Sequence, residues 1–340
     1  MESPAPGPLR IGILGAANIA RQFTSGVAPS RLVAVTAVAS RDLPKAQSFA
    51  KECGIERALG SYEALLADPQ IDAIYIPLPN TLHAQWAIRA LEAGKHVLCE
   101  KPLATKAADA RAMFEAARRH KVHLVEAYPY LAQPLSLKLR ELVATGAIGK
   151  IQLIRSSFGV PFSDATNIRL KADGGGGALL DAGSYAVSLI RIVAGERPQR
   201  VYAVARMGET GVDTTVVATL EFASGLLAQM ACSFSTSYHR HAMISGETGV
   251  IETNYLNHPP LGGAPALTIR RGATVVTTLE TVEAPGGNGF LFEAESFQKL
   301  VTLGPAHWTG TTPEESIDIA LTLDAILQSI RSNSAAMVAP

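Results

Sequence analysis

Three side chains from two separate parts of the sequence could together move a proton. Lys101 follows a short apolar run, whereas Asp181 and Tyr185 are four residues apart in a segment with helical spacing. Residues four apart on a helix share a face, so the aspartate and the tyrosine could contact one substrate. A tyrosine with a pKa of about 10 is a weak base, but a nearby ammonium group stabilises tyrosinate and binds a developing alkoxide. Hydride transfer between a nicotinamide and a carbinol carbon needs such an acid–base group.

The same residues also have purely structural interpretations. Glu100-Lys101-Pro102 could be a strand end stopped by proline, with a surface ion pair of little energetic value. Asp181 could stabilise a helix terminus, with Tyr185 half-buried behind it. Their occurrence in this order after a nucleotide-binding turn favours the catalytic interpretation.

That turn lies near the N-terminus and is rich in glycine and alanine. Residues 12–20, Gly-Ile-Leu-Gly-Ala-Ala-Asn-Ile-Ala, follow a first strand and open a helix, whose free amides would bind a pyrophosphate. The fingerprint is imperfect because Ala17 and Ala20 replace its second and third glycines. A tight turn without a ligand is the alternative. The residues that we expect to contact the cofactor here are Gly15, Ala17, Asn18 and Ile19.

The end of the second predicted strand favours NADP over NAD as the cofactor. A NAD-specific site places an acid there to bind the ribose 2′-hydroxyl, whereas this chain has Ser40 and Arg41. A guanidinium donates paired, charge-assisted hydrogen bonds to phosphate oxygens, which suits a 2′-phosphate. Lys45 could supply a further contact. A solvated surface side chain is the alternative interpretation of Arg41.

The first part of the chain has the alternating pattern of βαβ units, which build a doubly wound parallel sheet. Amphipathic helices are expected at 81–93, ended by Gly94, and at 106–120, with Thr105 as the N-cap. We assign residues 1–127 to a dinucleotide-binding domain. Its short β-branched runs predict strands at 10–14, 32–39, 73–77, 96–99 and 122–126.

Residues 128–340 have a different pattern and form the second predicted domain. Helices are expected at 135–145, 179–192 and 314–331, and Pro/Gly-rich loops at 257–265 and 285–289. A run of strands favours one open, mostly antiparallel sheet, so the fold class is α/β with an N-terminal parallel sheet and a C-terminal α/β domain. The predicted strands are 150–158, 201–207, 214–222, 226–235, 242–245, 250–254, 267–270 and 273–278.

The amino-acid composition favours a globular protein and argues against nucleic-acid and membrane partners. The 340 residues suggest two domains at about 150 residues each, and 47% apolar against 18% charged residues is typical of a globular protein. Thirty basic and thirty acidic residues balance, which argues against a nucleic-acid partner. The three cysteines, which are odd in number and widely spaced, indicate a reducing compartment. With no leader pattern and no apolar run of about 18 residues, we expect a cytoplasmic protein without a membrane anchor.

Two other kinds of motif carry less weight. The pairs His120/His123 and His239/His241 lack an acidic or thiol cluster at ligand spacing, so no metal is predicted. Gly174 to Gly177 is not followed by the Lys-Ser/Thr of a phosphate-binding loop. A close backbone approach to substrate, or a flexible turn before a helix, explains the glycines better.

Several motifs resemble those of the glucose-fructose oxidoreductase/inositol dehydrogenase-like (Gfo/Idh/MocA) family of NAD(P)-dependent sugar dehydrogenases. They are Pro79-Asn80-Thr-Leu-His83, Gly94 to Ala104 with its Glu100-Lys101-Pro102, Asn167-Ile-Arg169-Leu, and Gly174 to Tyr185. The resemblance continues from Asp213 to Gly249 and covers nearly the whole chain. Tyr185 stands where many members have histidine, and in this the chain resembles the branch that contains glucose-fructose oxidoreductase itself, the dimeric trans-dihydrodiol dehydrogenases and the xylose dehydrogenases.

This resemblance implies a Rossmann domain, a second α/β domain and a nicotinamide in the cleft between them. It implies that Lys101 lies beside the reacting carbon, that Asp181 positions the substrate and that Tyr185 transfers the proton. Pro79, Asn80, His83 and Glu100 would contact the cofactor, and Tyr128 and Arg169 the substrate. Related sugar dehydrogenases often carry an arginine and a histidine where this chain has Leu131 and Ala132, so fewer charged donors would face the cleft.

The sequence thus predicts an NADP(H)-dependent oxidoreductase acting on a sugar, a cyclic polyol or a related diol. A homodimer or homotetramer, packed through the exposed face of the second sheet, is also expected. Two alternatives stay open: a ligand-sensing regulator that binds NADP without turnover, and a glycosidase that uses tightly bound NAD. Intact Lys101, Asp181 and Tyr185 argue against the first, and Ser40 with Arg41 argues against the second.

Overall fold

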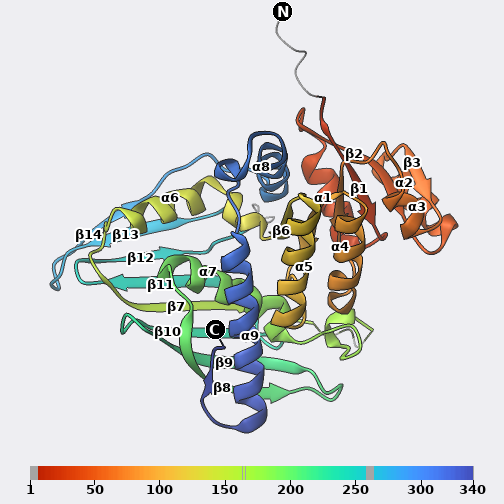
Figure 1. The fold of residues 1–340 in the computed structure, drawn as a ribbon. Helices are drawn as coiled ribbons and strands as arrows, with labels where there is room; N and C mark the ends of the chain where they lie inside the picture. The colour runs from red at the N-terminus through yellow and green to blue at the C-terminus, as the bar shows by residue number, and fades with distance from the viewer. Residues whose placement is uncertain (1–6, 163, 165, 258–263, 340) are drawn as a thin grey trace, which may run out of the picture.

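Two β-sheets, each covered by helices, lie side by side in the computed structural model, which describes residues 7–162, 164, 166–257 and 264–339 (Figure 1). The N-terminal sheet is parallel, with strand order β3-β2-β1-β4-β5-β6. Its central strands are mostly apolar and mostly buried because helices cover both faces. The strands are Leu9–Leu14 (β1), Val33–Ala39 (β2), Arg57–Leu59 (β3), Ala73–Ile76 (β4), His96–Glu100 (β5) and Leu124–Ala127 (β6).

Helices connect these strands in the order that the sequence predicts. In α1, Ala20, Phe23 and Val27 recur at helical spacing and are buried. The five predicted strands are confirmed within a few residues, whereas the short edge strand β3 was not predicted. The helices are Asn18–Val27 (α1), Leu43–Cys53 (α2), Tyr62–Leu66 (α3), His83–Glu92 (α4) and Ala107–His120 (α5), and a 3-10 turn, Asn80–Leu82 (η1), precedes α4.

The predicted N-cap of α5 is wrong. Lys106, not Thr105, occupies the cap position, and its side chain makes no capping hydrogen bond. The Asp324 carboxylate, from the last helix of the chain, instead accepts from the Ala107 backbone N–H at 2.9 Å. A local sequence pattern cannot reveal a cap that comes from 217 residues away.

The second sheet has the strand order β14-β13-β12-β11-β7-β10-β9-β8-β15. Among the described strands of this second sheet, only β7 and β10 pair in parallel, so the predicted mostly antiparallel sheet is confirmed. The strand predicted at 273–278 is wrong, because β14 begins at Thr278. The strands are Ile151–Gly159 (β7), Pro198–Met207 (β8), Asp213–Phe222 (β9), Leu227–Ser233 (β10), His239–Gly246 (β11), Gly249–Thr253 (β12), Leu267–Arg271 (β13), Thr278–Thr281 (β14) and Ala336–Met337 (β15).

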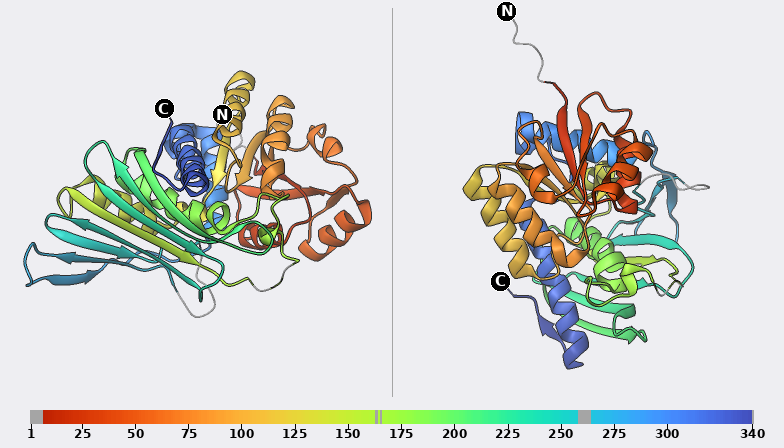
Figure 2. Two further views of the ribbon diagram at one scale, coloured as in Figure 1. Left: turned by 90° about the horizontal axis from the view of Figure 1, so that it is seen from below. Right: turned by 90° about the vertical axis from the view of Figure 1, so that its right-hand side faces the viewer.

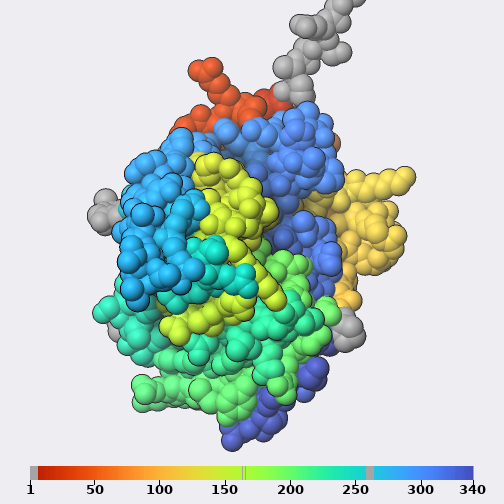
Figure 3. Space-filling model, turned by 90° about the vertical axis from the view of Figure 1, so that its left-hand side faces the viewer, coloured from red at the N-terminus to blue at the C-terminus, as the bar shows by residue number. Residues whose placement is uncertain are grey.

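Helices α7 (Ser184–Ala194) and α9 (Pro313–Ser332) cover one face of this sheet, and the other face is open (Figure 2). A capping box of Thr312 and Glu315, with Pro313 in the first turn, begins α9. Helix α6 (Pro134–Ala144) lies beside the edge strands β13 and β14 (Figure 3). Most of the loop predicted at 257–265 lies outside the described residues.

Helix α8 (Gly289–Leu303) was not predicted, and it crosses back to the first sheet. Phe290 and Phe297 are buried together with Phe23 of α1 and Tyr75 of β4. The second part of the chain therefore contributes a helix to the core beneath the first sheet. The domain boundary at 127/128 stays a prediction.

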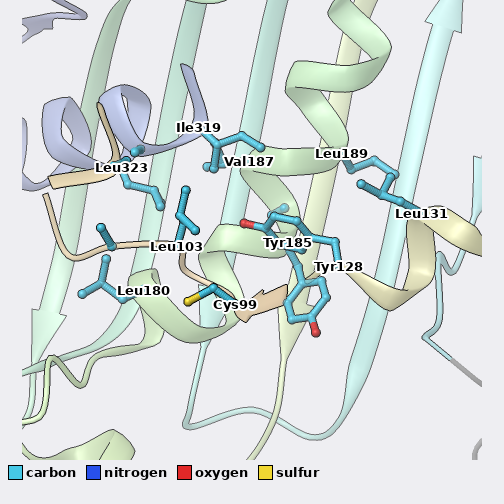
Figure 4. Packing of buried hydrophobic residues seen from close by; sticks show 14 of the residues in the cluster. Cys99, Leu103, Tyr128, Leu131, Leu180, Tyr185, Val187, Leu189, Ile319 and Leu323 are labelled. Atoms are coloured by element: carbon cyan, nitrogen blue, oxygen red, sulfur yellow. The ribbon is translucent and has the colours of Figure 1, made fainter. Parts of the chain in front are cut away.

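A second core cluster joins the two units from the other side of the first sheet. Cys99 and Leu103, from β5 and the loop after it, pack with Leu180, Val187 of α7 and Ile319 of α9 (Figure 4). This continuous apolar contact fixes the end of β5 against the start of α7. The residues with candidate chemistry lie at that junction.

Candidate active site

A cavity of about 520 Å³ lies between the two sheets, at the carboxyl ends of β1, β4 and β5. Ligands of doubly wound sheets bind at this edge. The first sheet contributes Asn18, Ile19, Asn80, Glu100 and Lys101, together with Leu78. The second unit contributes Phe158, Phe162, Arg169, Asp181, Tyr185, Arg240, Asn257 and Phe290.

Lys101 and Asp181 form an ion pair at the centre of this wall. Lys101 Nζ lies 2.5 Å from Asp181 Oδ1 and donates to the Asp181 carbonyl oxygen at 3.1 Å. Arg169 Nε donates to the other carboxylate oxygen at 2.8 Å. Burial by itself raises the pKa of Asp181, but the charges of Lys101 and Arg169 hold that pKa below its ordinary value. Asp181 is therefore ionised, and its hydrogen bonds fix the orientation of the Lys101 side chain.

A buried turn positions Asp181 ahead of α7. Residues Leu179–Gly183 (η4) form a single π-helical turn, a feature that is frequent at functional sites. The Asp213 carboxylate accepts from the Leu179 N–H at 2.7 Å and so holds the turn on β9. Gly177 has a φ of +115°, and a Cβ there would come within 2.3 Å of Asp213 Oδ1. The glycine run is thus needed where the chain passes closely over this carboxylate.

Tyr185, in the first turn of α7, lines the cavity beside the ion pair. Lys101 Nζ lies 4.8 Å from the centroid of its ring, and Asn257 Nδ2 donates to its hydroxyl oxygen at 3.0 Å. Burial raises the pKa of Tyr185 above its ordinary value, while the charge of Arg240 opposes that shift. The phenol is consequently protonated at neutral pH.

The N-terminus of α1 fits a dinucleotide pyrophosphate. Ala17 is the N-cap and supplies no side-chain acceptor to the first amides, and Asn18 and Ile19 line the cavity. Gly15 has a φ of +107°, and a Cβ there would lie 2.8 Å from Leu78 Cδ2. The predicted turn is therefore present, and a small N-cap leaves the helix amides open to a ligand.

Residues expected at the 2′-phosphate lie at the start of α2, away from the cavity. Arg41 is exposed and close to the Tyr62 hydroxyl, and Lys45 is exposed on the first turn. Ser40 is buried and its hydroxyl accepts from the Asp42 N–H at 3.3 Å. The Asp42 carboxylate caps α2 by accepting from the Lys45 N–H. Two exposed cations at one helix start suit a phosphate better than a ribose hydroxyl.

The cofactor residues predicted in the Pro-Asn-Thr-Leu-His motif have different surroundings. Asn80 lines the cavity and its amide donates to the Gly175 carbonyl at 2.8 Å, while Pro79 caps the η1 turn. The ring of His83 is fully buried, with its nitrogens 2.9 and 2.8 Å from the Pro102 and Leu78 carbonyl oxygens. His83 thereby ties together the loops that follow β4 and β5.

Glu100 lies directly before Lys101 and reaches the cavity from the end of β5. Its carboxyl group accepts from the Tyr75 hydroxyl at 2.6 Å. Burial raises the pKa of Glu100, and the hydrogen bond from Tyr75 and the charge of Lys101 act against this shift. The side chain therefore places a buried carboxyl group with a raised pKa beside the lysine.

Tyr128 lies behind Tyr185 and does not line the cavity. The two rings meet edge to face at 5.4 Å, and the Tyr128 hydroxyl donates to the Ser184 carbonyl at 3.4 Å. Tyr128 thus packs the base of the site, whereas Arg169, the other residue expected at the substrate, does line the cavity.

Sequence reasoning missed Arg240 and Asn257 as site residues. Arg240 lies between His239 and His241 in β11, two exposed histidines whose spacing suggests only a metal site. The period of two in a strand places Arg240 on the buried face with Ala242 and Ile244, and this signal could have revealed it. Asn257 follows β12 without any motif, so nothing in the sequence pointed to it.

Neither histidine pair gathers metal ligands in the structure. Across the described ranges, no group of three or more His, Cys, Asp or Glu side chains is arranged to hold a metal ion. His123 instead stacks on His96, with ring centroids 5.4 Å apart. Among the helices of the described residues, none is both long and apolar enough to span a membrane.

A doubly wound sheet with an open helix N-terminus beside a Lys-Asp-Tyr cluster defines a nucleotide-binding oxidoreductase. Residues 9–128 match the family described as oxidoreductase family, NAD-binding Rossmann fold, and residues 136–252 match the GFO/IDH/MocA C-terminal domain. The chain therefore belongs to the Gfo/Idh/MocA oxidoreductase family. The predictions of this family, of an enzyme and of the fold class are confirmed.

Similar proteins span the full length of the chain. It is 37% identical over 334 residues to a D-xylose 1-dehydrogenase (NADP(+)) of Haloferax volcanii, which covers 96% of this chain and 99% of that protein. It is 34% identical to a trans-1,2-dihydrobenzene-1,2-diol dehydrogenase of Xenopus laevis, with 94% and 97% covered. A 3-ketoreductase of Actinomadura kijaniata, solved with NADP and TDP-benzene, superposes with a TM-score of 0.85 at 33% identity, with 95% and 98% covered.

Proposed function

We propose that this chain is an NADP(H)-dependent oxidoreductase that interconverts a hydroxyl and a carbonyl group on a sugar, a cyclic polyol or a related diol. The observation that carries the proposal is the meeting of Lys101, Asp181 and Tyr185 at one cavity beside the N-terminus of α1. The names of the similar proteins support it: they describe a D-xylose dehydrogenase that uses NADP, a dehydrogenase of a cyclic diol, and a 3-ketoreductase solved with NADP.

NADP, when bound, supplies or accepts the hydride. Gly15, Ala17, Asn18 and Ile19 would hold its pyrophosphate through backbone amides. Ser40, Arg41 and Lys45 would bind the 2′-phosphate, which a carboxylate at the strand end would repel. The remaining contacts are assigned to the strand-end loops, through Pro79, Asn80, His83, Glu100 and Lys101.

Tyr185 moves the proton in this proposal. Its raised pKa keeps the phenol protonated, so during reduction its hydroxyl gives a proton to the substrate oxygen. During oxidation the phenol first gives up its proton to solvent, and the resulting tyrosinate takes the proton from the substrate hydroxyl. Lys101 Nζ, held by Asp181, donates a hydrogen bond to the same substrate oxygen as negative charge develops there.

Neighbouring side chains orient Lys101 and Tyr185. The Asp181 carboxylate accepts hydrogen bonds from both Lys101 and Arg169, so it orients the lysine and holds Arg169 at the rim of the cavity. Tyr128 supports the ring of Tyr185 from behind. Because Phe158, Phe162 and Phe290 also line the cavity, a ring with one apolar face fits it better than a uniformly hydroxylated chain.

The proposal extends to organisation and location. Residues 1–127 would form the dinucleotide-binding domain, and residues 128–340 the domain for substrate binding and oligomerisation. A homodimer or homotetramer would cover the open sheet face, which exposes Tyr202, Val204, Val217 and Leu227. Three free cysteines, at 53, 99 and 232, agree with the reducing environment of the cytoplasm.

A substrate panel tests this function. The purified protein is incubated with NADPH and ketosugars, and with NADP or NAD and aldoses, cyclic polyols and dihydrodiols, while nicotinamide absorbance is followed. We expect turnover with NADP(H) and at least one of these substrates. Binding of NADPH and of a sugar without any absorbance change would indicate a sensor. Release of sugar from a glycoside with no net change in NAD would indicate a glycosidase.

A further inference from the structure

Arg240 is a buried cation that reaches the cavity from the second sheet. Its side chain projects from the inner face of β11, next to Phe158 of β7, and the residue is 7% exposed. The carbon of its guanidinium lies 4.3 Å from the ring centroid of Tyr185, 4.6 Å from Tyr255, 4.8 Å from Phe158 and 5.6 Å from Tyr130. The faces of aromatic rings attract cations, so these four rings accommodate the charge.

No carboxylate pairs with this arginine in the part of the chain that the structure describes. Its buried Nε and Nη2 atoms also have no hydrogen-bond acceptor there. A buried charge without a counter-ion is costly to maintain. Nη1 donates to Asn257 Oδ1 at 3.3 Å, and the guanidinium also interacts with the Tyr255 side chain. Two of the contacts of Arg240 are therefore with Asn257 and with the ring of Tyr185.

The chemistry of a guanidinium fixes the direction of this hydrogen-bond chain. Arginine can only donate, so the oxygen of the Asn257 amide must face Arg240. The amide nitrogen then faces Tyr185 and donates to its hydroxyl oxygen at 3.0 Å. Gln133, itself buried, holds the Asn257 backbone by donating to its carbonyl at 2.6 Å. A flipped Asn257 amide would lose the hydrogen bonds to Arg240 and Tyr185, and a displaced backbone would lose the one from Gln133.

The hydrogen bond from Asn257 determines where the phenolic proton of Tyr185 can point. Because the Tyr185 oxygen accepts from Asn257, its own O–H does not point at the amide. Within the described residues no protein group accepts that proton, and the side chain borders the cavity. The proton is therefore available to a ligand in the cavity.

We propose that Arg240 and Asn257 are positioning residues for Tyr185: Arg240 fixes the Asn257 amide, and that amide donates to the phenolic oxygen so that the phenol presents its proton to the substrate. This inference rests on the proposed role of Tyr185 as the acid–base group. It assigns to the second unit two cavity-lining residues that act on the substrate through Tyr185.

The same arrangement favours tyrosinate during oxidation. An amide donor and a nearby cation both stabilise a phenolate more than a phenol. Other charged and titratable groups face Tyr185 as well: Lys101 and Glu100 from the first sheet, Asp181 from η4, and Tyr128 and Tyr130 from the segment after β6. Glu100 and Asp181 raise the pKa of Tyr185, so Arg240 and Asn257 work against two acids as well as against burial.

The test uses Asn257→Asp, which keeps the shape and the bond from Arg240 but removes the donor to Tyr185. The pH profile of kcat/KM for oxidation is compared with that of the unchanged protein, and NADPH affinity is measured by fluorescence. We expect the acid-side limb of this profile, where tyrosinate becomes protonated, to move up by about one pH unit or more and the rate near neutral pH to fall at least about tenfold. NADPH affinity should stay within about twofold. Arg240→Met should move the limb in the same direction, and Arg240→Lys should move it less.

Two controls separate this inference from the function on which it rests. Arg155→Met makes the same chemical change on β7, whose Arg155 side chain is exposed, and should leave the profile unchanged. In a Tyr185→Phe background, Asn257→Asp should change nothing further. A low rate for Tyr185→Phe together with an unchanged profile for Asn257→Asp overturns the positioning role and leaves the proposed function standing. Near-normal turnover of Tyr185→Phe overturns the proposed acid–base role itself.

Discussion

Lys101 Nζ and Asp181 Oδ1 lie 2.5 Å apart, although the residues are 80 positions apart in sequence and come from the two different units. Asp181 also holds Arg169, so neutralising it leaves two cations without their counter-ion. The sequence alone predicts that Asp181→Asn acts mainly on substrate affinity. Because the substitution also breaks the ion pair that orients Lys101, we expect kcat to fall by about 10- to 1,000-fold.

Steady-state kinetics check this expectation. Asp173→Asn, an exposed aspartate in the neighbouring glycine-rich loop, is the matched control and should behave like the unchanged protein. If Asp181→Asn raises KM but leaves kcat intact, the aspartate binds substrate without orienting Lys101.

Glu126 gives the fold a pH dependence of its own. This buried residue at the end of β6 accepts from the Leu103 N–H at 2.8 Å, and burial raises its pKa from 4.5 to about 7. The folded protein then binds a proton more tightly than the unfolded chain, so the free energy of unfolding falls as pH rises from 4.5 through about 7. Glu126→Gln should remove this loss and gain up to about 3 kcal/mol relative to the unchanged protein at alkaline pH.

Chemical denaturation at about pH 5 and about pH 8 measures this difference. The gain of Glu126→Gln should be clearly larger at the higher pH. An equal effect of the substitution at both values would show that Glu126 does not change its protonation state in this range.

Arg41 is expected to decide the choice of cofactor. It is exposed at the start of α2, where the proposed function assigns it to the 2′-phosphate. Arg41→Ala should weaken NADP binding by roughly 1.5 to 3 kcal/mol, which is the value of a charged hydrogen bond, and barely change NAD binding. Calorimetric titration with both cofactors measures this, with Lys51→Ala at the far end of α2 as the control. Equal losses for NADP and NAD would exclude Arg41 as the phosphate ligand.

The sequence predicted the parts of the site that depend on local pattern. The turn at Gly15, the strand end at Lys101 and the helical segment with Asp181 and Tyr185 all have recognisable spacing, and the structure brings them to one cavity. Arg240 and Asn257 were missed because their relation to Tyr185 depends on the register of β11 against β7 and on the path of the chain after β12. Non-local pairing of this kind leaves no periodic signal.

The errors in the predicted fold come from non-local contacts and from very short elements. Helix α8 has apolar residues on most of its surface, because it lies between the first sheet and the second unit, so it lacks a clear polar face. The cap of α5 comes from Asp324, far away in sequence. Edge strands such as β3 and β14 are too short for a pattern of alternating residues.

The open face of the second sheet should be an interface between copies of the chain. Along β8, Val201 and Ala203 are buried beneath α9, whereas Tyr202 and Val204 are 47% and 51% exposed on the other side. Val217 and Leu227 extend this apolar surface over β9 and β10. Light scattering at micromolar concentration should give the mass of a dimer or tetramer, and Val217→Lys should lower it. A monomeric mass for the unchanged protein would refute the interface.

Lys101 and Tyr185 should act as a unit. Lys101→Met removes the donor to the substrate oxygen and the cation beside the tyrosine ring, so it should be at least as damaging as Tyr185→Phe. The double substitution should cost little more than either single one. Additive losses, measured as kcat with a substrate from the panel, would mean that the two residues serve separate steps.

The central claim is that Tyr185 transfers the proton, and the pH profile of kcat for Tyr185→Phe tests it most directly. We predict a fall in kcat of about two to four orders of magnitude, loss of the basic limb and unchanged NADPH binding, because the phenol is the acid–base group and lies apart from the residues that hold the cofactor phosphates. A near-normal kcat with the same basic limb would contradict the account, since the proton would then pass through Lys101 or water.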